Sequence, residues 1–289
     1  ATGAICIFEK NDDDKNWRCV AWNIKPYEEY SKKTDINFMS KNNKRIAIIG
    51  GGPSGLMAAE TLAKAGFSIT IYERNPNLAR KFLMAGRGGL NITNSTNITD
   101  FIKRYNHNAE KIKPTLDAFT PEDLKLWCKN LGEETFTGSS GKVFPKSFKA
   151  SPLLREWKKR LEELNVEFKF KHKWLGWDNN DNLIFLSPEN IQLKITKPDI
   201  VIIALGGASW PKLGSDGNWV EIMQKQNIQV APLRPANCGF KVNWSDIIKN
   251  KFAGTPLKPV ILSCADKSVK GELMLTEQGL EGGAIYALS

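Results

Sequence analysis

Three glycines, Gly50, Gly52 and Gly55, have the spacing of a turn that binds a diphosphate. In a GxGxxG turn the first glycine permits a tight bend, the second lets the main chain approach the phosphates, and the third lets helix and strand pack closely. The helix that follows offers unpaired N–H groups and a partial positive charge to the anion. The residues expected to bind a dinucleotide here are Gly50, Gly52, Pro53, Ser54 and Gly55.

An acidic residue follows the turn at the distance that ribose binding requires. Glu73 lies 18 residues beyond Gly55. This is close to the roughly 20 residues at which a carboxylate would hydrogen-bond the ribose hydroxyls of the adenosine half. The neighbouring Arg74, also a candidate cofactor-binding residue, could favour a 2′-phosphate, but Glu73 in the ribose position argues against NADP at this site. FAD and NAD share the ADP moiety, so this unit alone leaves both open.

The elements that must position these residues form a βαβ unit. Residues 44–50, KRIAIIG, are the β-branched apolar run of a buried parallel strand. Residues 51–66 predict a Gly-rich turn and then a helix with Pro53 near its first turn and Gly66 at its end. Residues 68–73, SITIYE, predict the second strand.

A second glycine-rich element, LARKFLMAGRGGLNITN, occupies residues 78–94. Such a loop lets the main chain run close to a flat or phosphorylated ligand, with Arg87 supplying charge and Asn91 an amide. Its candidate cofactor-binding residues are Arg87, Gly88, Gly89 and Asn91.

With this loop in place, the chain resembles the bacterial flavoproteins of the BaiN/RdsA type, also described as aminoacetone-oxidase-like or bile-acid-reductase-like FAD enzymes. It is most similar to their GRGGLN subgroup. The resemblance runs from about residue 44 to the end, through GSSGKVFPKSFKASPLLREW (138–157), DIVIIALGGASWPKLGSDGNWV (199–220), PLRPANCGF (232–240) and GLEGGAIYALS (279–289).

The resemblance implies FAD as the cofactor and an α/β fold, a glutathione-reductase-like FAD-binding Rossmann domain with a β-meander and an inserted, mainly β substrate domain. It also implies that Gly206 and Gly207 lie near the cofactor and that residues 87–91 line its flavin side. The family continues beyond the GLEGGAIYALS motif and returns to the FAD domain. We therefore expect a C-terminally truncated chain with an incomplete inserted domain.

The chain is expected to divide into three parts. Residues 1–43 are a polar N-terminal extension of uncertain status: the native start could be Met39, or the extension could be genuine. Residues 44–229 are expected to form the FAD-binding domain, without its C-terminal return, and residues 230–289 the start of the inserted domain. Within the second part, Thr120 and Ser151 begin helices, and VEFKF, HKWLGW and LIFLS form a β-meander before a buried strand at 199–207.

Composition narrows the class of protein. The net charge of +10 raises the question of an anionic partner, but the basic residues are interleaved with acidic ones, which favours a solvated surface over a nucleic-acid groove. Five widely spaced cysteines without a CxxC pair, and two histidines without HExxH, support neither a disulfide framework nor a metal site. No apolar run is long enough for a membrane span and no secretory signal is present, so a reducing cytoplasm fits best.

Few side chains qualify as catalytic groups, and we assign none. Cys238 could be a redox thiol but lacks a nearby partner cysteine, so a place in the core is favoured. His107 is expected at the surface, and His172 on a solvent face or in ordinary packing. Five tryptophans could form an aromatic wall for a planar ligand, of which Trp210 has the best claim, yet packing is favoured for all of them. They are Trp157, Trp174, Trp177, Trp210 and Trp219.

We expect an FAD-dependent oxidoreductase that transfers hydride through the flavin to or from a small-molecule substrate, with NAD(P)H as the electron donor. No second GxGxxG is present for a nicotinamide cofactor. A first alternative is a remnant that binds the ADP half of FAD without turnover. A second is a flavoprotein that acts on nucleic acid. The sequence identifies neither the substrate nor the oligomeric state.

Overall fold

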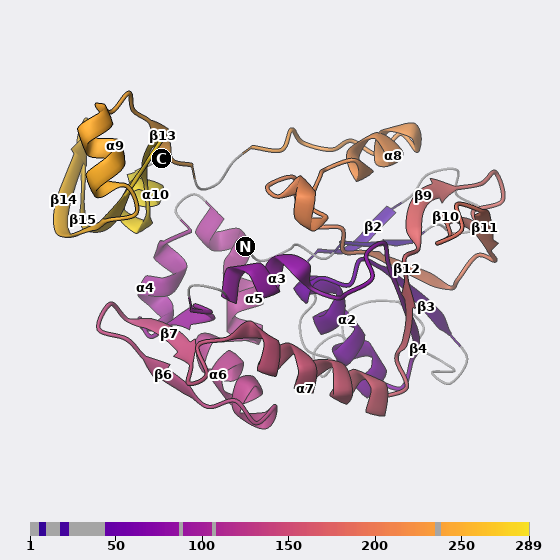
Figure 1. The fold of residues 1–289 in the computed structure, drawn as a ribbon. Helices are drawn as coiled ribbons and strands as arrows, with labels where there is room; N and C mark the ends of the chain where they lie inside the picture. The colour runs from indigo at the N-terminus through magenta and orange to yellow at the C-terminus, as the bar shows by residue number, and fades with distance from the viewer. Residues whose placement is uncertain are drawn as a thin grey trace. The chain divides into compact units, whose positions relative to one another are not determined.

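The computed structural model describes residues 6–9, 18–22, 44–86, 89–105, 108–234 and 238–288, the first two ranges as strands only (Figure 1). The chain divides into two compact units, Ala1–Val230 and Ala231–Ser289. None of the described helices is both long and apolar enough to cross a membrane.

The first unit is built on a six-stranded sheet of order β2-β1-β12-β3-β4-β8. Neighbouring strands β12, β3, β4 and β8 are parallel, whereas β1 is antiparallel to both β12 and β2. The strands of this sheet are β1 (Cys6–Glu9), β2 (Arg18–Trp22), β3 (Arg45–Ile49), β4 (Ser68–Glu73), β8 (Glu167–Phe170) and β12 (Ile200–Ile203).

Helices and smaller sheets surround it. The helices are α2 (Pro53–Lys64), α3 (Arg80–Ala85), α4 (Ile98–Lys103), α5 (Ala109–Ala118), α6 (Pro121–Asn130), α7 (Ala150–Glu163), the 3-10 turn η4 (Pro211–Leu213) and α8 (Trp219–Lys225). One small sheet contains β5 (Thr93–Asn94), β7 (Lys142–Pro145) and β6 (Thr135–Thr137). The other contains β9 (Lys173–Trp177), β10 (Leu183–Leu186) and β11 (Gln192–Ile195).

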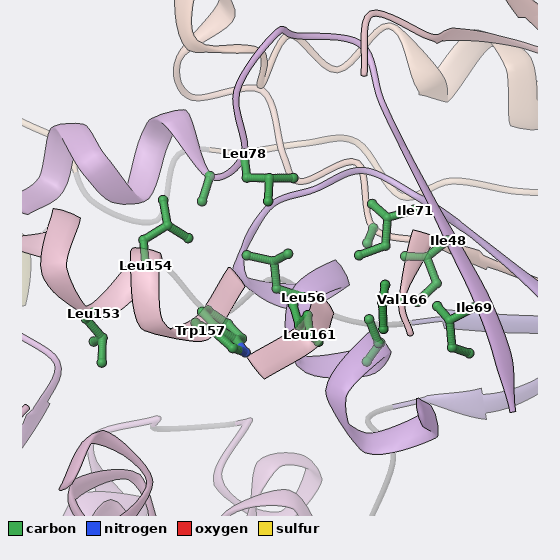
Figure 2. Close-up of a cluster of buried hydrophobic side chains, with 14 of the residues drawn as sticks. Ile48, Leu56, Ile69, Ile71, Leu78, Leu153, Leu154, Trp157, Leu161 and Val166 are labelled. Atoms are coloured by element: carbon green, nitrogen blue, oxygen red, sulfur yellow. The ribbon is translucent and has the colours of Figure 1, made fainter. Parts of the chain in front are cut away.

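Alternation along the parallel strands sends side chains into two separate cores. Ile48 and Ile71 pack on one face with residues of α2 and α7, in the cluster that Figure 2 shows. Ile49 and Tyr72 pack on the other face with residues of the small sheet of β9, β10 and β11. Both faces of the sheet are therefore covered, which explains why the neighbouring strands β3 and β12 are apolar runs without polar alternation.

The α/β class and the parallel sheet are as the sequence predicts, and so is the helix start at Thr120. The Thr120 side chain accepts a hydrogen bond from the Asp123 main chain at 3.1 Å, and Asp123 accepts one from the Thr120 main chain at 2.8 Å. This reciprocal capping box satisfies two N–H groups at the start of α6.

One strand assignment was wrong. The run VEFKF was expected as the first strand of the meander, but β8 pairs in parallel with β4 at the edge of the main sheet. The meander is formed instead by β9, β10 and β11, each antiparallel to the next. Short strands separated by turns are alike locally, so only pairing across the fold distinguishes the two arrangements.

The second unit consists of a four-stranded antiparallel sheet of order β13-β16-β15-β14 with two short helices. Its elements are β13 (Phe240–Lys241), α9 (Asp246–Phe252), β14 (Pro256–Cys264), β15 (Lys267–Thr276), β16 (Gly279–Glu281) and α10 (Gly283–Leu288). Its buried residues include Leu273, Ala284 and Ile285, so β15 and α10 provide its core.

Candidate functional site

The glycine-rich turn connects β3 to α2, and each of its three glycines has a different spatial role. Gly50 has φ +112°, and a Cβ at this position would lie 2.4 Å from the carbonyl oxygen of Ala204. A Cβ on Gly55 would lie 2.0 Å from the carbonyl oxygen of Gly50. Around Gly52, by contrast, no described atom lies within 4 Å of the Cβ position. The turn is thus packed tightly against main-chain atoms at Gly50 and Gly55, and it is open at Gly52.

Helix α2 begins at the open position. Gly52 is its N-cap and has no side chain that could cap the helix, and Pro53 occupies the first turn, followed by Ser54. The first N–H groups of a helix need acceptors from outside the helix, and a phosphate supplies them. The twelve-residue length of α2 aligns enough peptide dipoles to favour an anion there.

Glu73 is the last residue of β4, and its side chain contacts the turn directly. One carboxylate oxygen accepts a hydrogen bond from the Gly51 main-chain N–H at 2.8 Å. The other accepts from the main chain of Asn75 at 2.8 Å and from its side-chain amide at 2.7 Å. Glu73 is only 8% exposed, so these bonds hold the carboxylate in one orientation at the carboxyl end of the sheet.

Asn75 is a site residue that the sequence reasoning missed. Besides donating to Glu73, its side-chain oxygen accepts a hydrogen bond from Arg80 at 2.8 Å. Arg80 lies in the first turn of α3, which also contacts the glycine turn because the Ala79 main chain donates to Gly51 at 2.9 Å. The sequence signal that could have identified Asn75 is its place two residues after Glu73, because asparagine side chains often hydrogen-bond main-chain groups close by in sequence.

Arg74 is occupied by a partner distant in sequence. Its guanidinium donates to Asp216 at 2.7 Å, and the two side chains are 26% and 22% exposed. Burial alone would raise the pKa of Asp216, but the hydrogen bonds from Arg74 and the Asn218 main chain, together with the positive charge of Arg74, outweigh burial and hold that pKa below its usual range. The possibility that Arg74 receives a 2′-phosphate is therefore weakened, because a carboxylate already neutralises it.

Breaking this pair should loosen the loop that carries Asp216. In a double-mutant cycle of Arg74→Gln and Asp216→Asn, we expect a coupling energy of about 1 kcal/mol, the upper part of the range for partly exposed pairs. Urea unfolding of the four proteins measures it, and the coupling should weaken with added salt. The matched control is Lys103 with Asp100, a pair with side chains 72% and 50% exposed, which should couple less. Equal coupling in the two cycles would contradict the role of the Arg74 pair.

The loop after β12 reaches the same edge of the sheet as the glycine turn. The Ala204 main chain donates to Ile49 at 2.8 Å, which places the start of this loop beside Gly50. Gly206 has φ +73°, and its carbonyl accepts from the Trp219 indole at 3.0 Å. The Gly207 carbonyl accepts from the Ser215 hydroxyl at 2.8 Å. Parallel strands thus bring the turn, Glu73 and Gly206–Gly207 together at their carboxyl ends.

The second glycine-rich element is described only in part, because Arg87 and Gly88 lie outside the described residues. Gly89 has φ +99°, and a Cβ there would lie 3.3 Å from the Phe148 ring. The Asn91 side chain donates to the carbonyls of Thr93 at 2.8 Å and Val143 at 3.2 Å. In this structure Asn91 therefore ties its loop to β5 and β7.

Of the five tryptophans considered as a wall for a planar ligand, four are buried or half-buried and Trp210 is exposed. Trp157 and Trp174 are buried and Trp177 and Trp219 half-buried, as packing predicts. The prediction that Trp210 packs in the core was wrong, since it is 56% exposed. Its neighbours Gly206–Ser209 and Pro211–Lys212 are exposed too, so the local chain offers the indole no core to enter.

Of the candidate reactive groups that the structure describes, neither His172 nor Cys238 stands out. His172 bonds the Phe170 carbonyl through Nδ1 at 2.7 Å and lies against the rings of Tyr72 and Phe185, so it is a packing residue. Cys238 is half-buried, not part of the core as expected. His107 lies outside the described residues.

Comparison with known proteins agrees with the expected family. The chain is 26% identical over 254 residues to the ribosomal RNA dihydrouridine synthase of Haemophilus influenzae, covering 87% of this chain and 62% of that protein. It is 26% identical over 254 residues to the 3-dehydro-bile acid delta(4,6)-reductase of Clostridium scindens, covering 85% and 59%. The chain thus spans about three-fifths of the length of these curated relatives.

Among solved structures, a 3-ketosteroid-delta4-(5alpha)-dehydrogenase from Rhodococcus jostii aligns with TM-score 0.48 and 12% identity, over 70% of this chain and 56% of that one. A family model described as the HI0933-like protein Rossmann domain matches residues 44–284, from the first strand of the βαβ unit into α10. The chain therefore belongs to the HI0933-like Rossmann-domain family.

Proposed function

We propose that this chain binds FAD at the carboxyl edge of the parallel sheet and belongs to an enzyme that reduces a ring carbon–carbon double bond conjugated to a carbonyl. The observation that carries the proposal is Glu73, a buried carboxylate fixed against the main chain of the glycine turn. In this position it can accept hydrogen bonds from the ribose hydroxyls while the open Gly52 faces the diphosphate.

The proposed cofactor site comprises the turn, the acid, the second glycine-rich element and the loop after β12. Its residues are Gly50, Gly52, Pro53, Ser54, Gly55, Glu73, Arg74, Arg87, Gly88, Gly89, Asn91, Gly206 and Gly207. Arg74 would contribute indirectly, because its ion pair with Asp216 would hold the loop after β12 near the adenosine half of FAD. Residues 231–289 would begin the domain that contacts the substrate.

The two relatives support the type of reaction. Their names describe formation of dihydrouridine, in which the ring double bond of uridine is saturated, and reduction of double bonds in a 3-oxo ring system. Both substrates contain a double bond conjugated to a carbonyl. Saturation would add one hydride and one proton; a bound flavin would supply the hydride, and NAD(P)H would be the donor that reduces the flavin again.

Glu73 variants test cofactor binding. Loss of charged hydrogen bonds to the ribose should raise the Kd for FAD about 10- to 100-fold in Glu73→Ala, with Glu73→Gln in between. The Kd for ADP should rise in parallel, because Glu73 would contact only the half that FAD and ADP share. Flavin fluorescence measures the first affinity and calorimetry the second.

The control for Glu73 is Glu167→Gln. Glu167 begins β8, at the amino end of the same sheet, where it accepts from Thr70. This variant should bind FAD and ADP as the unmodified chain does. If Glu73→Ala retains full FAD affinity, or if the unmodified chain never carries flavin, the proposed site is wrong.

The alternative of a binding remnant predicts FAD binding without turnover. To distinguish the remnant from an active enzyme, the rate of NAD(P)H-driven reduction of bound FAD is compared between this chain and a polypeptide extended beyond Ser289. Equal rates contradict the remnant, and reduction only in the extended polypeptide supports it. An RNA that contains uridine and a 3-oxo-Δ4,6 steroid are then tested in separate assays as substrates for reduction of the ring double bond.

A further inference from the structure

Phe148, between β7 and α7, has an unusual backbone conformation for an aromatic residue. Its φ is +55°, in the left-handed region, and its side chain is 51% exposed. A bulky side chain is disfavoured in this region, which glycine and asparagine enter readily. Strained residues of this kind gather at ligand sites, so the surroundings of the ring are informative.

Ring contacts hold the Phe148 side chain in place. Its ring centroid lies 4.9 Å from that of Phe136 in β6 and 5.8 Å from that of Phe144 in β7. The rings of Phe136 and Phe144 also stack on each other, with centroids 5.8 Å apart. The Phe148 main chain donates to the Pro145 carbonyl at 2.9 Å. Both the backbone and the ring of Phe148 are therefore fixed, although half of the side chain remains open to solvent.

The segment that carries Phe148 packs against the second glycine-rich element at two points. A Cβ on Gly89 would lie 3.3 Å from the Phe148 ring and 3.7 Å from the Phe144 ring. A Cβ on Gly86 would lie 2.5 Å from the Cβ of Ala150, the first residue of α7. These two glycines bring the main chain of the element directly alongside the segment, so Phe148 is its immediate neighbour.

The fold places this region at the carboxyl edge of the parallel sheet. Helix α7 leads into β8, which is parallel to β4, and a helix between parallel strands runs back from the carboxyl edge to the amino edge. Near its end, α7 donates from Arg160 to Glu60, near the end of α2, at 3.1 Å. The start of α7, like the start of α2, therefore lies at the edge where the glycine turn is found.

Helix α3 separates this region from the adenosine side of the proposed site. It starts at Arg80, which bonds Asn75, the hydrogen-bond partner of Glu73, and it ends just before Gly86. Six residues of α-helix advance about 9 Å. A dinucleotide with its adenosine half at Glu73 and its diphosphate at Gly52 would therefore extend its flavin half toward Gly86 and the segment beside it.

We propose that Phe148 lies against the flavin ring of FAD and forms one wall of its site, an inference that rests on the proposed function. Aromatic rings attract a flat conjugated ring, and a ring already held by its neighbours loses little conformational entropy on binding. Gly89 has no side chain, so its main chain can contact the same flat group. Glu73 would bind the adenosine half and Phe148 the flavin half.

The test compares FAD with ADP, because only FAD carries the flavin ring. In Phe148→Leu the Kd for FAD should rise about five- to tenfold while the Kd for ADP stays unchanged. Leucine keeps the unfavourable backbone conformation, so this variant isolates the effect of the ring. Phe148→Asn removes both the ring and the strain and should lose at least as much FAD affinity, whereas Phe148→Tyr should restore it.

The control is Phe119→Leu, which removes another exposed aromatic of the first unit, 37% exposed, and should change neither Kd. Flavin fluorescence measures the affinity for FAD, calorimetry the affinity for ADP, and thermal unfolding the stability of each variant. Binding of ADP by the Phe148 variants shows that their nucleotide site is folded.

Unchanged FAD affinity in Phe148→Leu and Phe148→Asn would overturn the inference. An equal rise in the Kd for ADP would overturn it too, because the ring would then support the whole site and not the flavin half. A lower melting temperature with an unchanged ratio of the two affinities would assign Phe148 to packing alone. Failure of the proposed function looks different, since the unmodified chain would then bind neither FAD nor ADP.

Discussion

Gly55→Ala is expected to destabilise the first unit by about 3 kcal/mol and to abolish FAD binding. The added Cβ would lie 2.0 Å from the Gly50 carbonyl oxygen, a main-chain atom that cannot rotate away, so α2 must move off β3. Moving the helix displaces its N-terminal N–H groups from the position of the phosphates. Thermal unfolding and flavin titration measure the two effects.

Gly52→Ala is the matched control, and it should separate stability from binding. Gly52 has φ −81°, which alanine adopts, and no described atom lies within 4 Å of the Cβ position. Stability should change by no more than about 1 kcal/mol, the loss expected for alanine at an N-cap. FAD affinity should nevertheless fall, because the methyl group points into the space left for the diphosphate. Unchanged FAD affinity in this variant would show that the phosphates lie elsewhere.

Glu60→Gln is expected to cost about 3 kcal/mol, which for a unit of this size lowers the melting temperature by roughly 6–12 °C. Glu60 is on the buried side of α2, with its side chain only 3% exposed. Its carboxylate accepts from the indoles of Trp127 at 3.0 Å and Trp157 at 2.8 Å, from Arg160 at 3.1 Å, and from Lys64 at 2.5 Å. A neutral amide of the same size turns one acceptor into a donor and leaves the cations uncompensated.

The pH dependence of stability gives an independent check. Burial alone would raise the pKa of Glu60, but hydrogen bonds from Lys64, Trp127 and Arg160 outweigh it and hold that pKa below the ordinary 4.5. A depressed pKa in the folded state stabilises above the unfolded-state pKa, and this stability is lost as pH falls through the folded value. The gap between the unmodified chain and Glu60→Gln should therefore be constant at neutral pH and shrink below about pH 4.5.

The control for this variant is Glu122→Gln in α6. Glu122 is 75% exposed and pairs with Lys125 on the helix surface, so the melting temperature should barely change. Similar shifts in the two variants would mean that the buried carboxylate has no special role. Because Glu60 joins α2 to α6 and α7, its loss should also lower FAD affinity by loosening the helix that begins at the phosphate turn.

The features that the sequence determined by itself are local ones. The apolar run at 44–50 and the glycines at 50, 52 and 55 depend on the conformational preferences of a few adjacent residues. Spacing alone therefore predicted the βαβ unit, and the structure places Glu73 against the turn as that unit requires. The capping box at Thr120 is local in the same way.

Only the tertiary structure decided which distant residues meet. Arg74 and Asp216 are 142 positions apart, and Glu60 is 100 positions from Arg160. An acid in a helix ordinarily faces water, so nothing in the local pattern identifies Glu60 as the buried acceptor of two indoles. The same limit explains the misplaced β8 and the exposed Trp210, since strand pairing and burial depend on what the rest of the chain brings alongside.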